Sequence, residues 1–137
     1  MFKLVKILGS RTNVPDICEI PIDGVAKCMK DCPYYLVDGA LAAMATNTKE
    51  RLVFIPIEDI PANSGRKKVK GYYVTPDMIF EAQYSEDPAL SCLGETASYF
   101  TDGEANTGVG TIEGSDLKIV NIDSLYITGL VHVVLRW

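Results

Sequence analysis

Short segments in which apolar and polar residues alternate at a period of two run through most of this chain, and they limit its fold more than any other feature. The clearest is the segment 77–84, DMIFEAQY. Successive side chains of a strand point to opposite faces, so this segment predicts a strand with one buried face and one wet face. We expect Met78, Phe80 and Tyr84 to be buried, and Glu81 and Gln83 to stay in water.

Other segments also favour strands, and turn signals separate them. No segment keeps a helical period for more than about two turns. The run RLVFIPI at 51–57 is continuously apolar, which indicates burial on both faces, while Pro21 makes the segment 17–22 an edge strand or bends it. Asp38-Gly39 and Asp102-Gly103 predict hairpin turns. Further strands are expected at 2–8, 34–37, 117–123 and 129–137.

These patterns predict an all-β fold: a small single-domain barrel or sandwich over residues 1–137, with about 7–9 short strands and at most one short helix. The helix candidate is EDPALSCLGE at 86–95, because Asp87 can cap it and Pro88 suits its first turn. Two segments are expected to be irregular. They are an N-terminal arm, residues 1–14, which includes the first short strand, and a long Gly-rich loop, residues 102–116.

Composition excludes several classes of protein. A chain of 137 residues with 47% hydrophobic residues is long enough to bury a core without metal or disulfides. Its net charge of −5 repels phosphate, so we expect no nucleic-acid partner. No apolar run approaches the roughly 18 residues of a membrane span, and Lys3 and Lys6 interrupt the N-terminus too soon for a secretory signal. We therefore expect no membrane partner and a soluble protein of the compartment that made it.

The reactive residue types form no complete catalytic or metal-binding motif. Cys28 and Cys32 have the spacing of half a zinc site, but the other half is missing. Buried free thiols are the favoured interpretation of the cysteines, with a zinc site or one disulfide as alternatives. The single histidine, His132, alternates with valines and should face solvent or a partner. Asp77 and Glu81 lie about 13 Å apart along an extended strand, too far for the carboxylate pair of a retaining glycosidase. We expect no enzyme, no catalytic residue, no metal and no cofactor.

The order of strands and turns resembles that of small β-rich head decoration (cement) proteins of tailed bacteriophages. The resemblance rests on YLVDGAL at 35–41, IPIED at 55–59, VTPDMIFE at 74–81 and VHVVL at 131–135. It covers most of the chain from Cys18 onward. The chain departs from that pattern at KDCP, residues 30–33, where a glycine is expected before the hairpin.

The resemblance implies a virion protein that is made in the host cytoplasm and binds the exterior of the capsid. Its partner would be the major capsid protein, whose neighbouring subunits it would clamp, and it could form a homo-oligomer such as a trimer. The contacts are expected in the irregular segments, at Phe2, Lys3, Arg11, Asn13, Glu104, Asn106, Thr107 and Glu113. Two alternatives stay open: another virion part such as a tail or neck component, and a cytosolic small β-barrel enzyme or ligand-binding module with a site at the barrel mouth.

Overall fold

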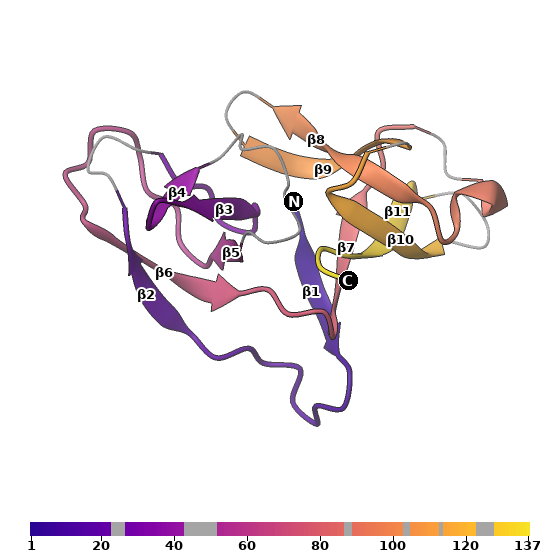
Figure 1. Cartoon of the computed structure of the whole chain (residues 1–137), viewed down its shortest axis with the longest axis horizontal. Coiled ribbons are helices and arrows are strands. Elements are labelled where there is room, and N and C mark those ends of the chain that lie inside the picture. The colour runs from indigo at the N-terminus through magenta and orange to yellow at the C-terminus, as the bar shows by residue number, and fades with distance from the viewer. Residues whose placement is uncertain (23–26, 43–51, 87–88, 103–104, 113, 123–127) are drawn as a thin grey trace.

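The structure, a computed structural model, describes residues 1–22, 27–42, 52–86, 89–102, 105–112, 114–122 and 128–137. Within these residues the chain forms eleven strands and one short 3-10 turn (Figure 1). The strands make two antiparallel sheets, which are not closed into a barrel and are compatible with a sandwich. The prediction of an all-β fold is confirmed, but the described strands outnumber the expected 7–9.

The first sheet has six strands and occupies the right half of Figure 1. In spatial order they are β1 (Lys3–Ile7), β7 (Met78–Gln83), β11 (Leu130–Val134), β10 (Leu117–Ile122), β8 (Thr96–Asp102) and β9 (Ala105–Ile112). The sheet curls so that β9 returns to the end of β7, where the Ser85 N–H donates to the Val109 carbonyl at 2.9 Å. A single bridge, between Tyr84 and Val109, joins the two strands there.

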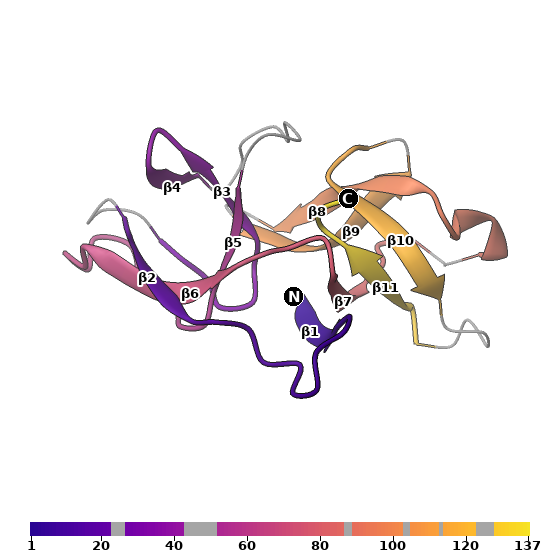
Figure 2. The ribbon, with the colours of Figure 1, turned by 60° about the horizontal axis from the view of Figure 1, so that its bottom comes forward.

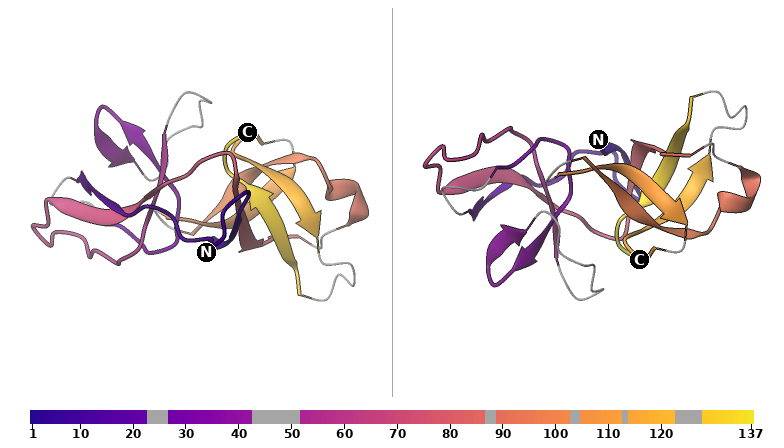
Figure 3. Two further views of the ribbon diagram at one scale, coloured as in Figure 1. Left: turned by 90° about the horizontal axis from the view of Figure 1, so that it is seen from below. Right: turned by 90° about the horizontal axis from the view of Figure 1, so that it is seen from above.

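The second sheet has five strands and lies on the left of Figure 1. Its order is β2 (Cys18–Pro21), β6 (Lys68–Tyr73), β5 (Val53–Pro56), β3 (Tyr34–Val37) and β4 (Ala40–Ala42). The β2 strand lies at the edge, as Pro21 predicts. Asp38 and Gly39 have φ of 51° and 78°, which matches the two-residue hairpin turn expected between β3 and β4. This hairpin, drawn in purple, projects from the rest of its sheet (Figure 3).

The main hydrophobic core is shared by both sheets. Tyr35, Ile55 and Tyr72 from the second sheet pack with residues of the first sheet that include Phe80 and Val131. A second cluster covers the other face of the second sheet. All four residues of β5 are buried, since Val53 and Ile55 enter the shared core and Phe54 enters the second cluster. Burial of this strand on both faces is therefore confirmed.

The expected register of β7 is confirmed for its apolar face. Met78 is 6% exposed, Phe80 0% and Tyr84 4%, whereas Gln83 on the other face is exposed. Glu81 is half-buried rather than fully wet.

A polar contact also links the two sheets. The Tyr35 hydroxyl on β3 donates to Asp116 Oδ1, at the residue before β10, at 3.3 Å.

The prediction of a long irregular loop over residues 102–116 is wrong. Residues 105–112 form β9, which pairs with β8 as a hairpin, and Ala105 and Val109 are buried. The glycines have a packing role here: a Cβ on Gly108 would lie 2.7 Å from the Gln83 carbonyl oxygen, and one on Gly110 would lie 2.8 Å from that of Tyr99. Glycine therefore marks close approach of strands rather than a flexible connection.

The prediction of an irregular N-terminal arm over residues 1–14 is only partly confirmed. Residues 3–7 form β1 at the edge of the first sheet, and Phe2 is fully buried in the shared core. The arm is thus part of the folded body, and only the residues after β1 form a loop. The helix expected at 86–95 is reduced to a 3-10 turn at Leu90–Cys92, while Asp87 and Pro88 lie outside the described residues. None of the helices in the described residues is long and apolar enough to cross a membrane.

Candidate functional site

One concave feature of the described residues is an open groove of about 370 Å³ beside β1. We call it the β1 groove. It lies between β1 and the loop that follows it, with Tyr72 of β6 as a further lining residue. Its full lining is Lys3, Leu4, Asn13, Val14, Pro15, Ile17, Lys30, Asp31, Ile57 and Tyr72. Figure 2 shows the chain leaving β1, turning back and running on to β2 beside β6.

Hydrogen bonds within the loop after β1 hold the first wall of the β1 groove in place. The Ser10 hydroxyl oxygen accepts the N–H groups of Thr12 and Asn13, each at 3.3 Å. Asn13 has a positive φ of 52°, a conformation that asparagine tolerates better than most residues. Its side-chain Oδ1 accepts the Ile7 N–H at 2.9 Å, which ties the loop to the end of β1.

The second wall is formed by Lys30 and Asp31, and backbone contacts hold it against β1 and β5. The Asp31 carbonyl accepts the Phe2 N–H at 2.8 Å, and the Asp31 N–H donates to the Pro56 carbonyl at 3.0 Å. The Lys30 N–H donates to Asp59 Oδ1 at 2.8 Å. These contacts fix the backbone, while the Lys30 side chain remains exposed.

Three large apolar side chains of the β1 groove face solvent. Val14 is 68% exposed, Ile17 48% and Ile57 37%. Clustered apolar surface of this kind, bordered by charged residues, is typical of a site that contacts another molecule.

The polar residues that line the β1 groove are two lysines, one aspartate, one asparagine and one tyrosine. Within the described part of the chain, neither Lys3 nor Lys30 forms an ion pair. Tyr72 is 5% exposed, and burial, followed by the negative charge of Asp31, raises the pKa of its hydroxyl. That hydroxyl stays protonated and can donate a hydrogen bond. The groove can therefore hold an apolar group beside a hydrogen-bond acceptor.

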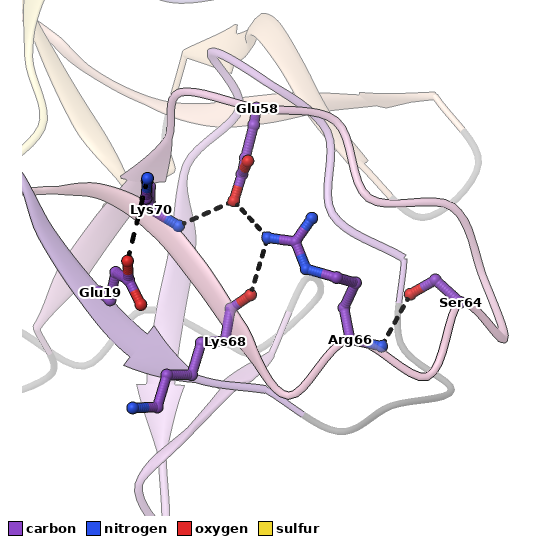
Figure 4. A network of polar contacts seen from close by, with 6 residues as sticks. All are labelled: Glu19, Glu58, Ser64, Arg66, Lys68 and Lys70. Atoms are coloured by element: carbon purple, nitrogen blue, oxygen red, sulfur yellow. Dashed lines mark hydrogen bonds and ion pairs between the residues drawn. The ribbon is translucent and has the colours of Figure 1, made fainter.

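The basic run at residues 66–70 is largely a structural network (Figure 4). Glu58 Oε1 accepts the Lys70 N–H at 3.1 Å and the Arg66 Nη2 at 2.8 Å. The hydrogen bond from the Lys70 N–H makes the largest contribution to lowering the pKa of the Glu58 carboxyl, and the Arg66 guanidinium lowers it further. Lys70 also lies 4.0 Å from Glu19 on β2. Two of the four basic side chains of this run, those of Arg66 and Lys70, thus have acidic partners within the protein. The run is therefore a weaker candidate site than the β1 groove.

The cysteines are free thiols, and three of the four are buried. Burial raises the pKa of Cys28 and of Cys32 from 9.0 to about 11, so both remain protonated near neutral pH and are poor nucleophiles. In the described residues, no three of the His, Cys, Asp and Glu side chains gather into a group that could hold a metal. His132 is partly exposed on the outer face of β11, with Nε2 3.5 Å from Glu81 Oε2.

The eight residues expected to contact a partner fall into three groups. Lys3 and Asn13 both line the β1 groove, and Arg11 is exposed in the loop beside it. The side chains of Phe2 and Asn106 are buried, and Thr107 is half-buried, so these three lie within the fold rather than on an open surface. Glu104 and Glu113 lie outside the described residues.

The structure also brings together the two segments that were expected to be separate contact arms. The N-terminal amine of Met1 donates to the Thr107 carbonyl on β9. The Phe2 ring packs edge-on against Tyr99 of β8, with centroids 5.6 Å apart. The start of the chain is therefore fixed on the β8–β9 hairpin.

Sequence reasoning missed four important residues of the β1 groove: Lys30, Asp31, Ile57 and Tyr72. Ile57 carried a weak signal, because it ends the apolar run 51–57 immediately before charged residues. Lys30, Asp31 and Tyr72 carried none, since they reach the groove only through strand pairing and loop contacts. Comparison of the chain with protein-family models, curated proteins and solved structures finds no match.

Proposed function

We propose that this protein is a non-enzymatic decoration protein of a tailed-phage capsid. It binds the exterior of the assembled shell and holds neighbouring major capsid subunits together. The resemblance in strand and turn pattern suggests this role. The structural observation that supports it best is the β1 groove, which exposes Val14, Ile17 and Ile57 beside lysines without an ion pair in the described residues.

The chemistry of the β1 groove suits association. Apolar side chains that lose water on contact provide affinity, and the surrounding polar groups set the orientation of the partner. The protein's net charge of −5 agrees with a place on the outside of the shell, where no contact with packaged DNA is needed. A clamp that binds only assembled subunits stabilises the particle by mass action.

Binding to capsids that lack the protein tests the proposal directly. Purified protein is added to capsids assembled from the major capsid protein of the same phage, and the disassembly temperature is measured by calorimetry. We expect saturable binding and a higher disassembly temperature. An Ile17→Asp variant should bind more weakly, whereas Leu90→Asp, at a residue 67% exposed on the 3-10 turn, should bind like the wild type.

Two outcomes would overturn the proposal. One is failure of the wild-type protein to bind capsids, and the other is its absence from purified virions. Gold labelling of virions in electron micrographs separates the decoration role from a tail or neck role, since only the former places label over the head. Deleting residues 102–116 would not be a clean test of binding, because it removes β9 and the buried Val109.

A further inference from the structure

The charge of the β1 groove is opposite in sign to that of the whole protein. The chain carries a net charge of −5, but the groove contains Lys3 and Lys30 against one carboxylate, Asp31. Elsewhere, Arg66 pairs with Glu58 at 2.8 Å and Lys70 lies 4.0 Å from Glu19. Local positive charge on an acidic protein attracts an acidic partner and repels a basic one.

Neither groove lysine forms an ion pair among the described residues, although the Asp59 carboxylate lies at the Lys30 backbone, where its Oδ1 accepts the Lys30 N–H at 2.8 Å. Lys3 lies opposite Glu81 in the strand register, but no ion pair joins the two. Lys30 precedes Asp31, and its exposed side chain likewise forms no ion pair with a described residue. A carboxylate that enters the groove would therefore meet a lining that includes Lys3, Lys30 and Tyr72, whose side chains can all donate hydrogen bonds.

The apolar part of the β1 groove requires a second feature of the occupant. Val14, Ile17 and Ile57 line it and are exposed, and Pro15 lines it and is half-buried. An apolar side chain seated among them would remove apolar surface on both molecules from water, which is favourable at about 25 cal/mol per Å². The occupant should thus carry an apolar side chain close to its carboxylate.

The edge of β1 indicates how such a segment lies. The Asp31 carbonyl already accepts the N–H of Phe2, the residue before β1, and Asn13 Oδ1 accepts the N–H of Ile7, the last residue of β1. A complete added strand would compete with these bonds, so recognition should depend chiefly on side chains. The groove volume of about 370 Å³ lies near the low end of the roughly 300–1,000 Å³ of ligand sites, which limits the occupant to a few residues.

We infer that the β1 groove binds a short extended segment of the capsid subunit in which an Asp or Glu lies next to an apolar residue. This inference rests on the proposed capsid role. The carboxylate lies between Lys3 and Lys30, and the apolar side chain packs on Ile17 and Ile57. Asp31 limits the excess charge of the site, which favours a single carboxylate over a polyanion.

Charge reversal tests the inference against a matched control. The groove variant is Lys3→Glu with Lys30→Glu, and the control is Lys67→Glu with Lys68→Glu, two exposed lysines of the basic run. Both variants change the net charge equally. We expect the groove variant to bind capsids at least tenfold more weakly at low salt and the control to stay within about threefold. A Lys3→Arg/Lys30→Arg variant should retain binding.

Carbodiimide cross-linking provides a second readout that no loss of folding can imitate. The reagent condenses a lysine amine with a nearby carboxylate, with loss of water, to form an amide. In the wild-type complex, mass spectrometry should find Lys3 or Lys30 joined to an Asp or Glu of the capsid subunit. If the wild type binds capsids while the groove variant binds equally well, or if cross-links come only from other lysines, the inference fails and the capsid role stands. If the wild type does not bind, both fail.

Discussion

Replacing Gly108 by alanine should destabilise the protein, because β9 approaches β7 too closely at that residue to accept a side chain. The added Cβ would lie 2.7 Å from the Gln83 carbonyl oxygen, a distance that real Cβ contacts essentially never show. Its other neighbours are ordinary contacts, at 3.8 Å and 3.9 Å. Relief requires movement of backbone, since the clashing atom is not the end of a flexible side chain.

The size of the effect follows from two opposing terms. Overpacking of this kind costs about 1–3 kcal/mol. Alanine also restricts the unfolded chain, which on its own stabilises the folded state by about 0.4–1 kcal/mol. We therefore expect a net loss of roughly 1–2 kcal/mol in the free energy of unfolding. If residues 102–116 were an open loop, only the second term would act and the variant would be more stable.

Urea unfolding followed by far-ultraviolet circular dichroism measures this difference. Thr111→Ala is the matched control, because Thr111 is exposed on the same strand and should change the free energy of unfolding by no more than about 0.5 kcal/mol. Hydrogen exchange adds a local test: the Ser85 amide, which donates to the Val109 carbonyl, should exchange faster in Gly108→Ala. A higher urea midpoint for Gly108→Ala would refute the close approach of β9 to β7.

Two further predictions concern the core and the thiols. Phe80→Ala should cost about 3–5 kcal/mol of unfolding free energy, because the ring is 0% exposed. Glu81→Ala should cost about half a kcal/mol or less. The reverse order in denaturant melts would mean that the β7 register is off by one residue. Burial raises the pKa of Cys28 and Cys32 to about 11. Their contribution to the free energy of unfolding is therefore complete below about pH 9, where the thiols of the unfolded chain are still protonated. It is lost as the pH rises to about 11. Unfolding free energies measured from pH 8 to 11 should fall less steeply for Cys28→Ala/Cys32→Ala, and an unchanged slope would contradict this assignment.

Local patterns in the sequence were enough to predict most of the strands and the turn between β3 and β4. The alternation over residues 77–84 identified the buried face of β7, and the continuous apolar run of β5 indicated its burial on both faces. Asp38-Gly39 predicted the hairpin between β3 and β4, since both residues must adopt positive φ. These properties depend on neighbouring residues along the chain and on side-chain direction within one strand.

The error over residues 102–116 shows where local patterns mislead. Glycine permits both loops and close strand packing, and the sequence does not show which of the two applies. In β9 the decision comes from the carbonyl oxygens of Gln83 and Tyr99, which lie in other strands and leave no room for a Cβ on Gly108 or Gly110. Burial of Val109 then makes this Gly-rich segment part of the core.

The β1 groove was determined almost entirely by tertiary structure. The sequence identified Lys3 and Asn13 as polar residues of the N-terminal segment, but it also selected Phe2, whose side chain is fully buried. Lys30 and Asp31 are held at the groove by the bond from the Phe2 N–H to the Asp31 carbonyl, and Tyr72 reaches it from β6 of the second sheet. Periodicity indicates which face of a strand is buried, but a site assembled from two sheets and three connecting segments depends on contacts between residues far apart in the chain.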